Sequence, residues 1–492
     1  MPSMLIRLGK EDVRVVLRDL GTIMEWSSVT FLAPLVASLF YMEGFRTIAA
    51  YILAAGIAFA VGFTLRNAFA PKQETDLKHA FLTAAAFWLL YCAVSALPFV
   101  LVQGMSFVDG YFEAMSALTT TGLTLMKFSI DFAPNSLVFW RSFLSWVGGV
   151  GIVVLALTGV LTTYSRASKL SYAEGREERI KPNIKNTIKE IWNIYIGLTL
   201  VGIVLLYLSD MDLFTAINYS MSAISTTGMD ITSQGLVGTY SPWVSLSLIV
   251  IMVLGATSFG VHYLVFKKRQ FKTLLLDAEF KTLILLGLMA AFMILPKMFL
   301  LFGGSLASIE QAFFHTFSAI SCGGFSLVTA NDVAAWDDFV KLVLIAVMFV
   351  GGSAGSTAGG IKISRFIIFV KSIYWRIKEA VLPEKSFFAK KFEGKNLELK
   401  QIKEINQFIL LWILLLGIGT LVLTLYGNSM ADSLFEVVSA QSNAGISTGI
   451  TNAAMPFGVK IMLIINMWIG RLEIIPILSA IGFMLSLRPS RR

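Results

Sequence analysis

Charged residues and cysteines are both scarce in this chain. Charged side chains make up 14% of its 492 residues, whereas a soluble domain carries about a quarter. Apolar residues make up 56% and gather in long runs, which indicates one integral membrane body,. Two cysteines, Cys92 and Cys322, exclude a disulfide framework,. Three widely separated histidines argue against a membrane zinc enzyme,.

Four short stretches of the chain are versions of one motif. Each begins with Ser-Ala, has Ser or Thr at the fourth position and has Gly at the seventh: residues 116–124, 222–230, 318–326 and 439–447. The shared glycines, which are spaced 106, 96 and 121 residues apart, are Gly122, Gly228, Gly324 and Gly445. Four matches dispersed through an apolar chain indicate one structural unit that occurs four times.

Apolar runs of about 20 residues predict ten membrane spans. They lie near 24–44, 47–66, 79–103, 136–162, 188–208, 241–266, 278–302, 338–372, 404–426 and 457–487. From the third span onward, each pair of spans encloses a half-apolar segment that ends in the motif and is too short to cross a bilayer. Each repeat is therefore predicted to be a span, a re-entrant pore helix, a filter strand and a second span. We expect breaks within the longest spans.

The expected fold is an all-α integral membrane protein with four parallel repeats around a pseudo-fourfold pore. The repeats are parallel because each contains two full crossings, whereas secondary transporters often use inverted repeats. The expected divisions are an N-terminal region with two extra spans (1–78), repeat one (79–165), repeat two (166–270), repeat three (271–375), and a cytosolic linker with repeat four (376–492).

The positive charges predict the orientation of the chain. Of the 40 lysines and arginines, 33 lie in the N-terminus, 66–78, 163–189, 267–281, 362–403 and the C-terminal tail. The positive-inside rule places these segments in the cytoplasm and the motifs on the outer side. The net charge of +9 thus requires no nucleic-acid partner. We expect a multi-pass cell-membrane protein in contact with lipid, with both termini cytoplasmic.

The end of each motif has the chemistry of a cation filter. Backbone carbonyls can replace the water shell of a cation, and Gly permits the backbone angles that aim them inward. The candidate residues, none of them acidic, are Thr120, Thr121, Gly122, Thr226, Thr227, Gly228, Cys322, Gly323, Gly324, Asn443, Ala444 and Gly445. This favours a monovalent ion such as K⁺ as substrate, without a covalently bound cofactor. The alternative is that small residues only permit close helix packing.

The motifs, in this order, resemble the TrkH/KtrB branch of the superfamily of potassium transporters, which also includes plant HKT proteins. The resemblance covers nearly the whole chain, including the two extra N-terminal spans of TrkH-like members. It is also carried by residues 140–142, 146–149, 351–362 and 468–473. It implies a homodimer with a pore in each protomer, and TrkA-like cytosolic nucleotide-binding subunits that open or close the pores.

The resemblance also bears on the choice of ion. In the family, Gly at the key filter position of every repeat goes with potassium selectivity, whereas Ser in the first repeat goes with sodium transport. This chain has Gly122 there, which favours potassium. Its departures from the family pattern are Cys322 in the third filter and Asn443 with Ala444 in the fourth.

The third repeat contains a candidate gate. Residues 351–360 include five glycines and two serines, and each glycine weakens a helix by about 1 kcal/mol relative to alanine. We predict a flexible intramembrane loop under the filter that can obstruct the ion path, as the resemblance also implies. Tight helix packing is the alternative. The candidate gating residues are Gly351, Gly352, Gly355, Gly359, Gly360, Lys362 and Arg471.

Arg471 leaves two alternatives open. An uncompensated arginine at mid-membrane costs about 2.5–3.5 kcal/mol, so Arg471 is expected to face the pore as a barrier or to pair with a carboxylate such as Glu473. Arg141 is expected to be structural. Glu113, Glu436 and His315 are expected to cap or brace the pore helices.

The predicted function is potassium uptake or conduction through a channel-like pore that a cytosolic nucleotide-binding subunit gates. A sodium-permeable or non-selective cation pore is the near alternative, and an ion-coupled secondary transporter is an alternative of another class. A hydrolase that uses Cys322 is the enzyme alternative, but no histidine is placed as its base, so no enzyme activity is expected. The charged segments 163–189 and 376–403 are the expected docking surface for the regulator.

Overall fold

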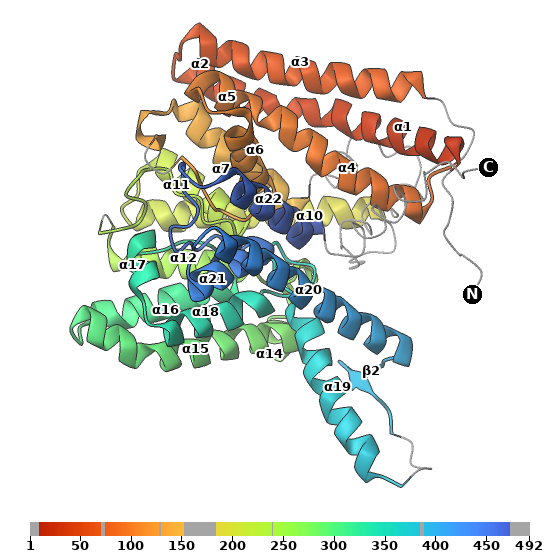
Figure 1. Cartoon of the computed structure of the whole chain (residues 1–492), viewed down its shortest axis with the longest axis vertical. Helices are drawn as coiled ribbons and strands as arrows, with labels where there is room; N and C mark the ends of the chain where they lie inside the picture. Colours follow the sequence, from red (N-terminus) through yellow and green to blue (C-terminus); the bar gives the residue numbers. More distant parts are fainter. Residues whose placement is uncertain are drawn as a thin grey trace.

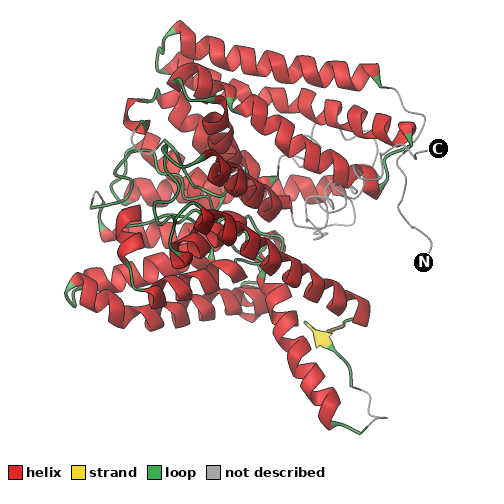
Figure 2. Cartoon of the chain, viewed as in Figure 1, coloured by secondary structure: helices red, strands yellow, loops and turns green. Residues whose placement is uncertain are grey.

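The structure, a computed structural model, describes residues 9–69, 74–126, 129–151, 184–238, 240–383 and 388–472. These residues are mostly helical, as Figures 1 and 2 show. Within them, one antiparallel hairpin pairs β1 (Lys391–Phe392) with β2 (Lys395–Asn396). Apart from this hairpin, the described residues have the expected all-helical architecture.

The chain opens with a helical hairpin along one side of the molecule (Figure 1). Its first arm runs through α1 (Lys10–Ser27), the 3-10 helix η1 (Ser28–Phe31) and α2 (Leu32–Phe40), and its second arm is α3 (Phe45–Ala68). Helix α1 begins at Lys10, although apolar content alone places the first span near residue 24. It is amphipathic, and it buries Val15, Leu20 and Ile23 on one face.

Helices α1 and α3 approach each other most closely at two glycines. A Cβ atom on Gly62 would overlap the backbone nitrogen of Glu25, and one on Gly21 would lie 2.5 Å from Arg66 N. An ion pair of 2.8 Å between Arg66 and Glu25 lies at the same crossing. The two backbones can therefore pack directly because no side chain separates them, as small residues allow in membrane helices.

The rest of the chain contains four sets of helices in the same order, here called quarters. Each has a long helix, a short helix of 12 to 15 residues, a loop and a second helix. The long helices are α4 (Leu77–Ser95) with α5 (Leu97–Gln103), α10 (Ile184–Leu208), α15 (Ala278–Phe302) and α20 (Leu399–Leu425). The short helices are α6 (Phe107–Leu118), α11 (Leu213–Ile224), α16 (Leu306–Ile320) and α21 (Met430–Gln441). The second helices are α7 (Asn135–Val150), α12 (Pro242–Gly255), α18 (Asp338–Val350) and α22 (Phe457–Leu472). Between them lie η2 (Ile130–Phe132), α13 (Phe259–Phe266), α14 (Lys272–Leu276), α17 (Ala330–Ala335) and α19 (Ile363–Val381).

The four quarters contact one another in a closed ring. The second helix of each quarter packs against the short helix of the next, so that α7 contacts α11, α12 contacts α16 and α18 contacts α21. The ring closes because α22 of the last quarter packs against α6 of the first. The four short helices therefore surround a common centre.

Three of the four second helices, α7, α12 and α22, contact the short helix of their own quarter at a glycine. A Cβ atom on Gly148 would overlap Leu118 O, and one on Gly470 would overlap Gln441 O. Gly255 has the same relation to Ile224 O, at 2.5 Å. The carbonyl in each case belongs to the last residue of the short helix in the same quarter. These crossings give a packing reason for the glycines in motifs 146–149 and 468–473.

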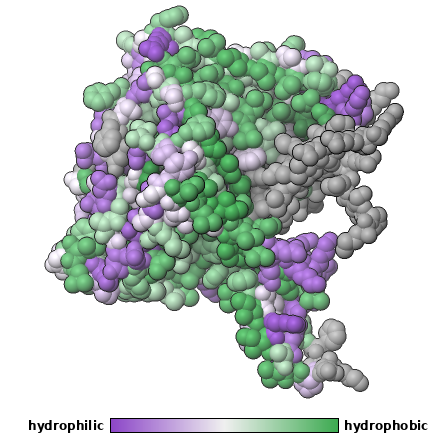
Figure 3. Space-filling model, viewed as in Figure 1, coloured by the Kyte–Doolittle hydropathy of each residue, from purple (hydrophilic) through white to green (hydrophobic). Residues whose placement is uncertain are grey.

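Six helical stretches in the described part of the chain are long and apolar enough to cross a membrane, and α12 with α13 forms a seventh if this pair, bent by 102°, is one span. The chain is therefore a multi-pass membrane protein, and Figure 3 shows apolar residues over much of its surface. The expected span 338–372 is not continuous, because residues 351–362 are not helical. The ends of spans 136–162 and 457–487 lie outside the described residues, as does most of segment 163–189. The expected division at 375/376 falls inside α19.

The contact between α1 and α3 gives a test of the packing. We expect Gly62→Ala to lower the free energy of unfolding by about 1–3 kcal/mol, because the added methyl group must push two backbones apart. Gly56→Ala is the matched control, since Gly56 lies on the same helix with no atom within 4 Å of the new Cβ. The melting temperature of both variants in detergent measures the difference. Equal melting temperatures would contradict the close contact.

Candidate functional site

Each short helix ends in the same backbone conformation. The second residue after the helix has a positive φ of 51° to 58° in every quarter: Thr120, Thr226, Cys322 and Asn443. Positive φ is strongly disfavoured for β-branched residues such as threonine. In the first loop the next amide, Thr121 N–H, donates to Ser116 O at 2.9 Å, and the equivalent bonds in the other loops measure 2.9, 2.7 and 2.8 Å. This turn redirects the chain from the helix into the loop four times.

The four loops meet at the motif glycines. A Cβ atom on Gly122 would overlap Thr227 O, one on Gly228 would lie 2.6 Å from Gly323 O, one on Gly324 would lie 2.5 Å from Ala444 O, and one on Gly445 would overlap Thr121 O. The contacts run from loop one to two, two to three, three to four and four to one. Each contacted carbonyl belongs to the residue before the next glycine. Backbone oxygens of all four loops thus lie together, with no room for a side chain at the glycines.

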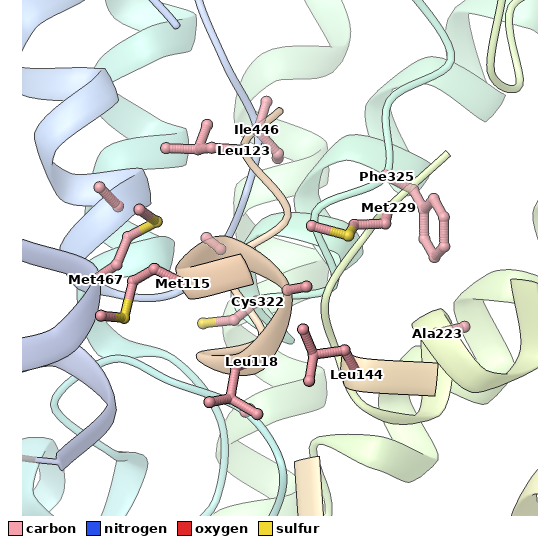
Figure 4. Packing of buried hydrophobic residues seen from close by; sticks show 14 of the residues in the cluster. Met115, Leu118, Leu123, Leu144, Ala223, Met229, Cys322, Phe325, Ile446 and Met467 are labelled. Atoms are coloured by element: carbon pink, nitrogen blue, oxygen red, sulfur yellow. The ribbon is translucent and has the colours of Figure 1, made fainter. Parts of the chain in front are cut away.

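The side chains of the loop residues pack away from this centre. The hydroxyl of Thr121 lies 2.8 Å from that of Thr119, and the hydroxyl of Thr227 lies 2.7 Å from that of Ser225. Cys322 is fully buried and belongs to the cluster of buried apolar residues, part of which is drawn in Figure 4. All twelve candidate filter residues of the sequence lie in these four loops.

Asn443, a departure from the family pattern, has a structural role in the fourth loop. Its side-chain nitrogen Nδ2 donates to Thr121 Oγ1 at 2.8 Å and to Met467 O at 3.1 Å. The first bond joins loop four to loop one, and the second joins loop four to α22. The amide therefore strengthens the contact at which the ring closes.

Four side chains on the short helices brace the loops. They stand nine residues before the glycines: Glu113, Tyr219, His315 and Glu436. Each contacts the residue two positions after its glycine. Glu113 Oε1, for example, accepts from Thr124 Oγ1 at 2.8 Å and from Met126 N–H at 3.1 Å. The sequence predicted that Glu113, His315 and Glu436 cap or brace the pore helices, whereas the structure shows them bracing the loops. It missed Tyr219, which the shared offset would have found.

Arg141 supports two loops from α7. Its side chain is 2% exposed and lies 3.5 Å from the Glu113 carboxylate. It donates to Thr124 Oγ1 at 3.0 Å and to the backbone oxygen of Asp230 at 2.9 Å. The carboxylate and these two oxygen partners compensate for the burial of its charge, so the structural role expected for Arg141 is confirmed.

An open cavity of about 100 Å³ lies on one side of the glycine contacts. Its lining includes the four glycines and the residues two positions further along each loop: Thr124, Asp230, Ser326 and Ser447. The lining combines these polar groups with apolar side chains such as Leu123, Ile130 and Ile446, and the cavity has space for water molecules. An ion at the glycines could therefore exchange with solvent on this side.

The opposite side of the glycine contacts is covered by residues 351–362. Thr357 N–H donates to Gly255 O at 3.2 Å, and its hydroxyl donates to Ile224 O at 2.9 Å. Gly360 N–H donates to Ser442 O at 3.1 Å. The segment therefore packs against the C-terminal ends of α11 and α21.

The predicted gating glycines all lie in this loop: Gly351, Gly352, Gly355, Gly359 and Gly360. The sequence predicted a non-helical and flexible segment. The structure confirms that it is non-helical but shows it tightly packed, because a Cβ atom on Gly359 would overlap Ser442 O. Gly355 O also accepts from Phe259 N–H at 3.0 Å, across the break between α12 and α13.

Arg471 joins this loop to the first quarter. Its guanidinium donates to Thr357 O at 2.9 Å, to Thr120 Oγ1 at 3.2 Å and to Gly149 O at 3.1 Å, and it also contacts Gly148 O. These partners are backbone carbonyls and one hydroxyl, and Glu473, which the sequence offered as one possible partner, lies outside the described residues. Lys362, the other candidate cation, donates to Ala358 O within the loop.

Comparison with known proteins agrees with this arrangement. Residues 48–486 match the family model TrkH, described as cation transport protein. An uncharacterized cation transporter of Methanocaldococcus jannaschii is 34% identical over 475 residues, which are 96% of each chain. The Trk system potassium uptake protein TrkH of Escherichia coli is 28% identical over 483 residues, which cover 94% of this chain and 97% of that protein.

A solved structure has the same fold. The crystal structure of the potassium transporter TrkH from Vibrio parahaemolyticus superimposes with a TM-score of 0.80 at 26% sequence identity. The match covers 97% of this chain and 99% of that one. The family model, the relatives and the solved structure thus agree with the resemblance noted in the sequence. The chain belongs to the TrkH family of membrane cation transport proteins, which is not a family of enzymes.

Proposed function

We propose that this chain takes up potassium through a pore whose selectivity filter is formed by the four loops. The observation that carries the proposal is the closed sequence of contacts in which each loop glycine meets a carbonyl of the next loop. Carbonyls gathered in this way can replace the water around a cation. The twelve candidate filter residues carry no acidic side chain, which favours a monovalent ion. The relatives named as potassium uptake proteins support potassium over sodium.

The proposed architecture has ten spans, of which the last eight form four parallel repeats around one pore. The contacts between successive quarters and between α22 and α6 support this arrangement. The clustering of 33 of the 40 lysines and arginines supports cytoplasmic termini and an outward-facing filter,. An ion-coupled secondary transporter would favour inverted repeats, which four units in the same order do not resemble.

The proposed gate is the loop 351–362 together with Arg471. The loop covers the inner side of the glycine contacts, and Arg471 ties it to Thr120 and to the carbonyl of Gly149. A guanidinium at this place would repel a cation that leaves the filter. Movement of α19, which follows the loop directly, is the proposed way in which a cytosolic event reaches the gate.

The proposed partners are a second copy of the chain and TrkA-like cytosolic nucleotide-binding subunits. The designation of relatives as parts of a Trk system supports a regulatory partner. The end of α19 and the β1–β2 hairpin project from the main body (Figure 1), and both belong to segment 376–403, which carries many basic residues. It is the proposed docking surface, together with segment 163–189.

Ion flux into liposomes that contain the purified protein tests the proposal. We expect uptake of potassium and rubidium to exceed that of sodium and lithium. Equal flux of all four ions would favour a non-selective cation pore. A requirement for a proton or sodium gradient would favour the coupled transporter instead.

The four loop glycines give the sharpest variants for this measurement. We expect Gly122→Ser, Gly228→Ser, Gly324→Ser and Gly445→Ser to reduce potassium flux or its preference over sodium, because each side chain would displace a carbonyl of the neighbouring loop. Gly104→Ser is the matched control, since Gly104 also has a positive φ but has no atom within 4 Å of the new Cβ. The shared filter is wrong if all four variants keep the flux and selectivity of the parent chain.

If the loop 351–362 acts as a gate, a deletion within it should increase ion flux. Removal of part of residues 355–359 should raise basal flux and weaken the dependence on the regulatory subunit, because the segment that covers the filter is shortened. Flux with and without the subunit, together with the elution profile of the purified variant, measures this. A well-folded deletion with unchanged or abolished flux would show that the loop is a packing element.

Substitution of Arg471 tests whether this residue obstructs the ion path or supports the filter. We expect Arg471→Ala to raise potassium flux with an unchanged melting temperature, because a positive charge and a tether of the loop are removed. Arg471→Lys is the companion variant, since it keeps the charge but not the forked hydrogen bonds. If Arg471 instead supports the filter, truncation should leave buried carbonyls without a partner, at about 1–3 kcal/mol each, and flux and melting temperature would fall together.

A further inference from the structure

One of the four residues that stand two positions after the loop glycines differs in chemistry from the other three. All four line the cavity on the outer side of the filter: Thr124, Asp230, Ser326 and Ser447. Three of them are hydroxyl residues, and Asp230 alone is acidic. The second loop therefore carries a carboxylate where the other loops carry a hydroxyl.

In the second quarter the carboxylate lies on the loop and the hydroxyl on the short helix, which is the reverse of the fourth quarter. In the fourth quarter the acid is on the short helix, where Glu436 is fully buried and accepts from the loop hydroxyl of Ser447 at 2.7 Å. In the second quarter the helix supplies the hydroxyl, and Tyr219 donates to Asp230 Oδ1 at 3.2 Å. The same brace is made with donor and acceptor reversed. The exchange moves the negative charge from the interior to the cavity wall.

The loop that follows is shaped to hold this carboxylate. A Cβ atom on Gly235 would lie 2.5 Å from Asp230 Oδ2, and Gly235 has a φ of 56°. Arg141 contacts Asp230 through the backbone oxygen and lies 3.5 Å from the Glu113 carboxylate. Glu113 thus pairs with Arg141, and Asp230 places a second carboxylate at the cavity wall.

We propose that Asp230 forms an outer cation-binding position, at which a partly hydrated potassium ion waits before it enters the ring of carbonyls. This rests on the proposed function, because it assumes that the cavity is the entrance of the pore. A carboxylate at a narrow mouth raises the local concentration of cations and the rate at which they arrive. Asp230 would therefore determine the rate of potassium entry when the external potassium concentration is low.

Asp230→Asn tests this, because an asparagine keeps an oxygen that can accept from Tyr219 while it removes the charge. Initial rates of potassium uptake into liposomes are measured over a range of external potassium concentrations. We expect the half-saturating concentration to rise roughly fivefold, the factor for one lost unit charge about 4 Å from a cation in a water-like medium. The maximal rate should be unchanged, and high concentrations of an impermeant salt should reduce the difference.

Two further variants separate the charge from the brace. Asp338→Asn removes the same charge from an exposed position in the first turn of α18, and it should leave the half-saturating concentration unchanged. Tyr219→Phe removes the hydrogen bond but keeps the Asp230 charge, so any loss of stability or flux that it causes should not depend on the salt or potassium concentration. Asp230→Glu should restore most of the apparent affinity.

Several results would overturn the inference. If Asp230→Asn has the half-saturating concentration and salt dependence of the parent chain, Asp230 holds no ion. If Asp230→Asn and Tyr219→Phe lose thermal stability and flux equally at every potassium concentration, Asp230 serves only the brace. These outcomes are distinct from failure of the proposed function, in which the parent chain itself carries no potassium and both proposals fall.

Discussion

The structure depends on the close approach of four backbone loops at positions where no side chain fits. Gly122, Gly228, Gly324 and Gly445 each lie against a carbonyl group of the next loop, so the contact distances leave no space for even a methyl group. The surrounding helices can be understood as the means of holding this arrangement. The loops follow directly on the short helices, and three of the second helices contact the ends of the short helices at glycines that again permit backbone contact.

A polar framework holds the loops inside an otherwise apolar body. Buried charges are costly unless they are paired or hydrogen-bonded, and the charged side chains here meet that condition in different ways. Arg141 lies between Glu113 and two oxygen atoms, and Glu436 accepts several bonds from loop four. Arg471 is satisfied in part by carbonyls from the first and third quarters. The framework fixes loop geometry where the strained φ of Thr120 and Thr226 would otherwise relax,.

Fourfold repetition applies to the backbone far more than to the side chains. The second residue after each short helix has a φ of 51° to 58°, although this residue is threonine, cysteine or asparagine. Because carbonyl groups form the contacts at the centre, the side chains are free to take up local tasks. Asn443 joins loop four to loop one, and Asp230 and Tyr219 reverse the brace of the first and fourth quarters. The two sides of the ring are consequently different, with an acid and hydroxyls on one side and an arginine-held loop on the other.

The sequence by itself determined the membrane setting, the four motif loops, the family and the interruption at 351–362. These follow from apolar runs, repeated residues and glycine content, all of which are local properties of the chain. It misplaced the start of α1, whose apolar residues follow a helical face rather than a continuous run, and it did not predict the 102° bend between α12 and α13. It also could not assign the partners of Arg471, which are as distant in the chain as Thr120 and Gly149. Only the tertiary structure decided these contacts, because local patterns show which face of a helix is buried but not which distant backbone that face meets.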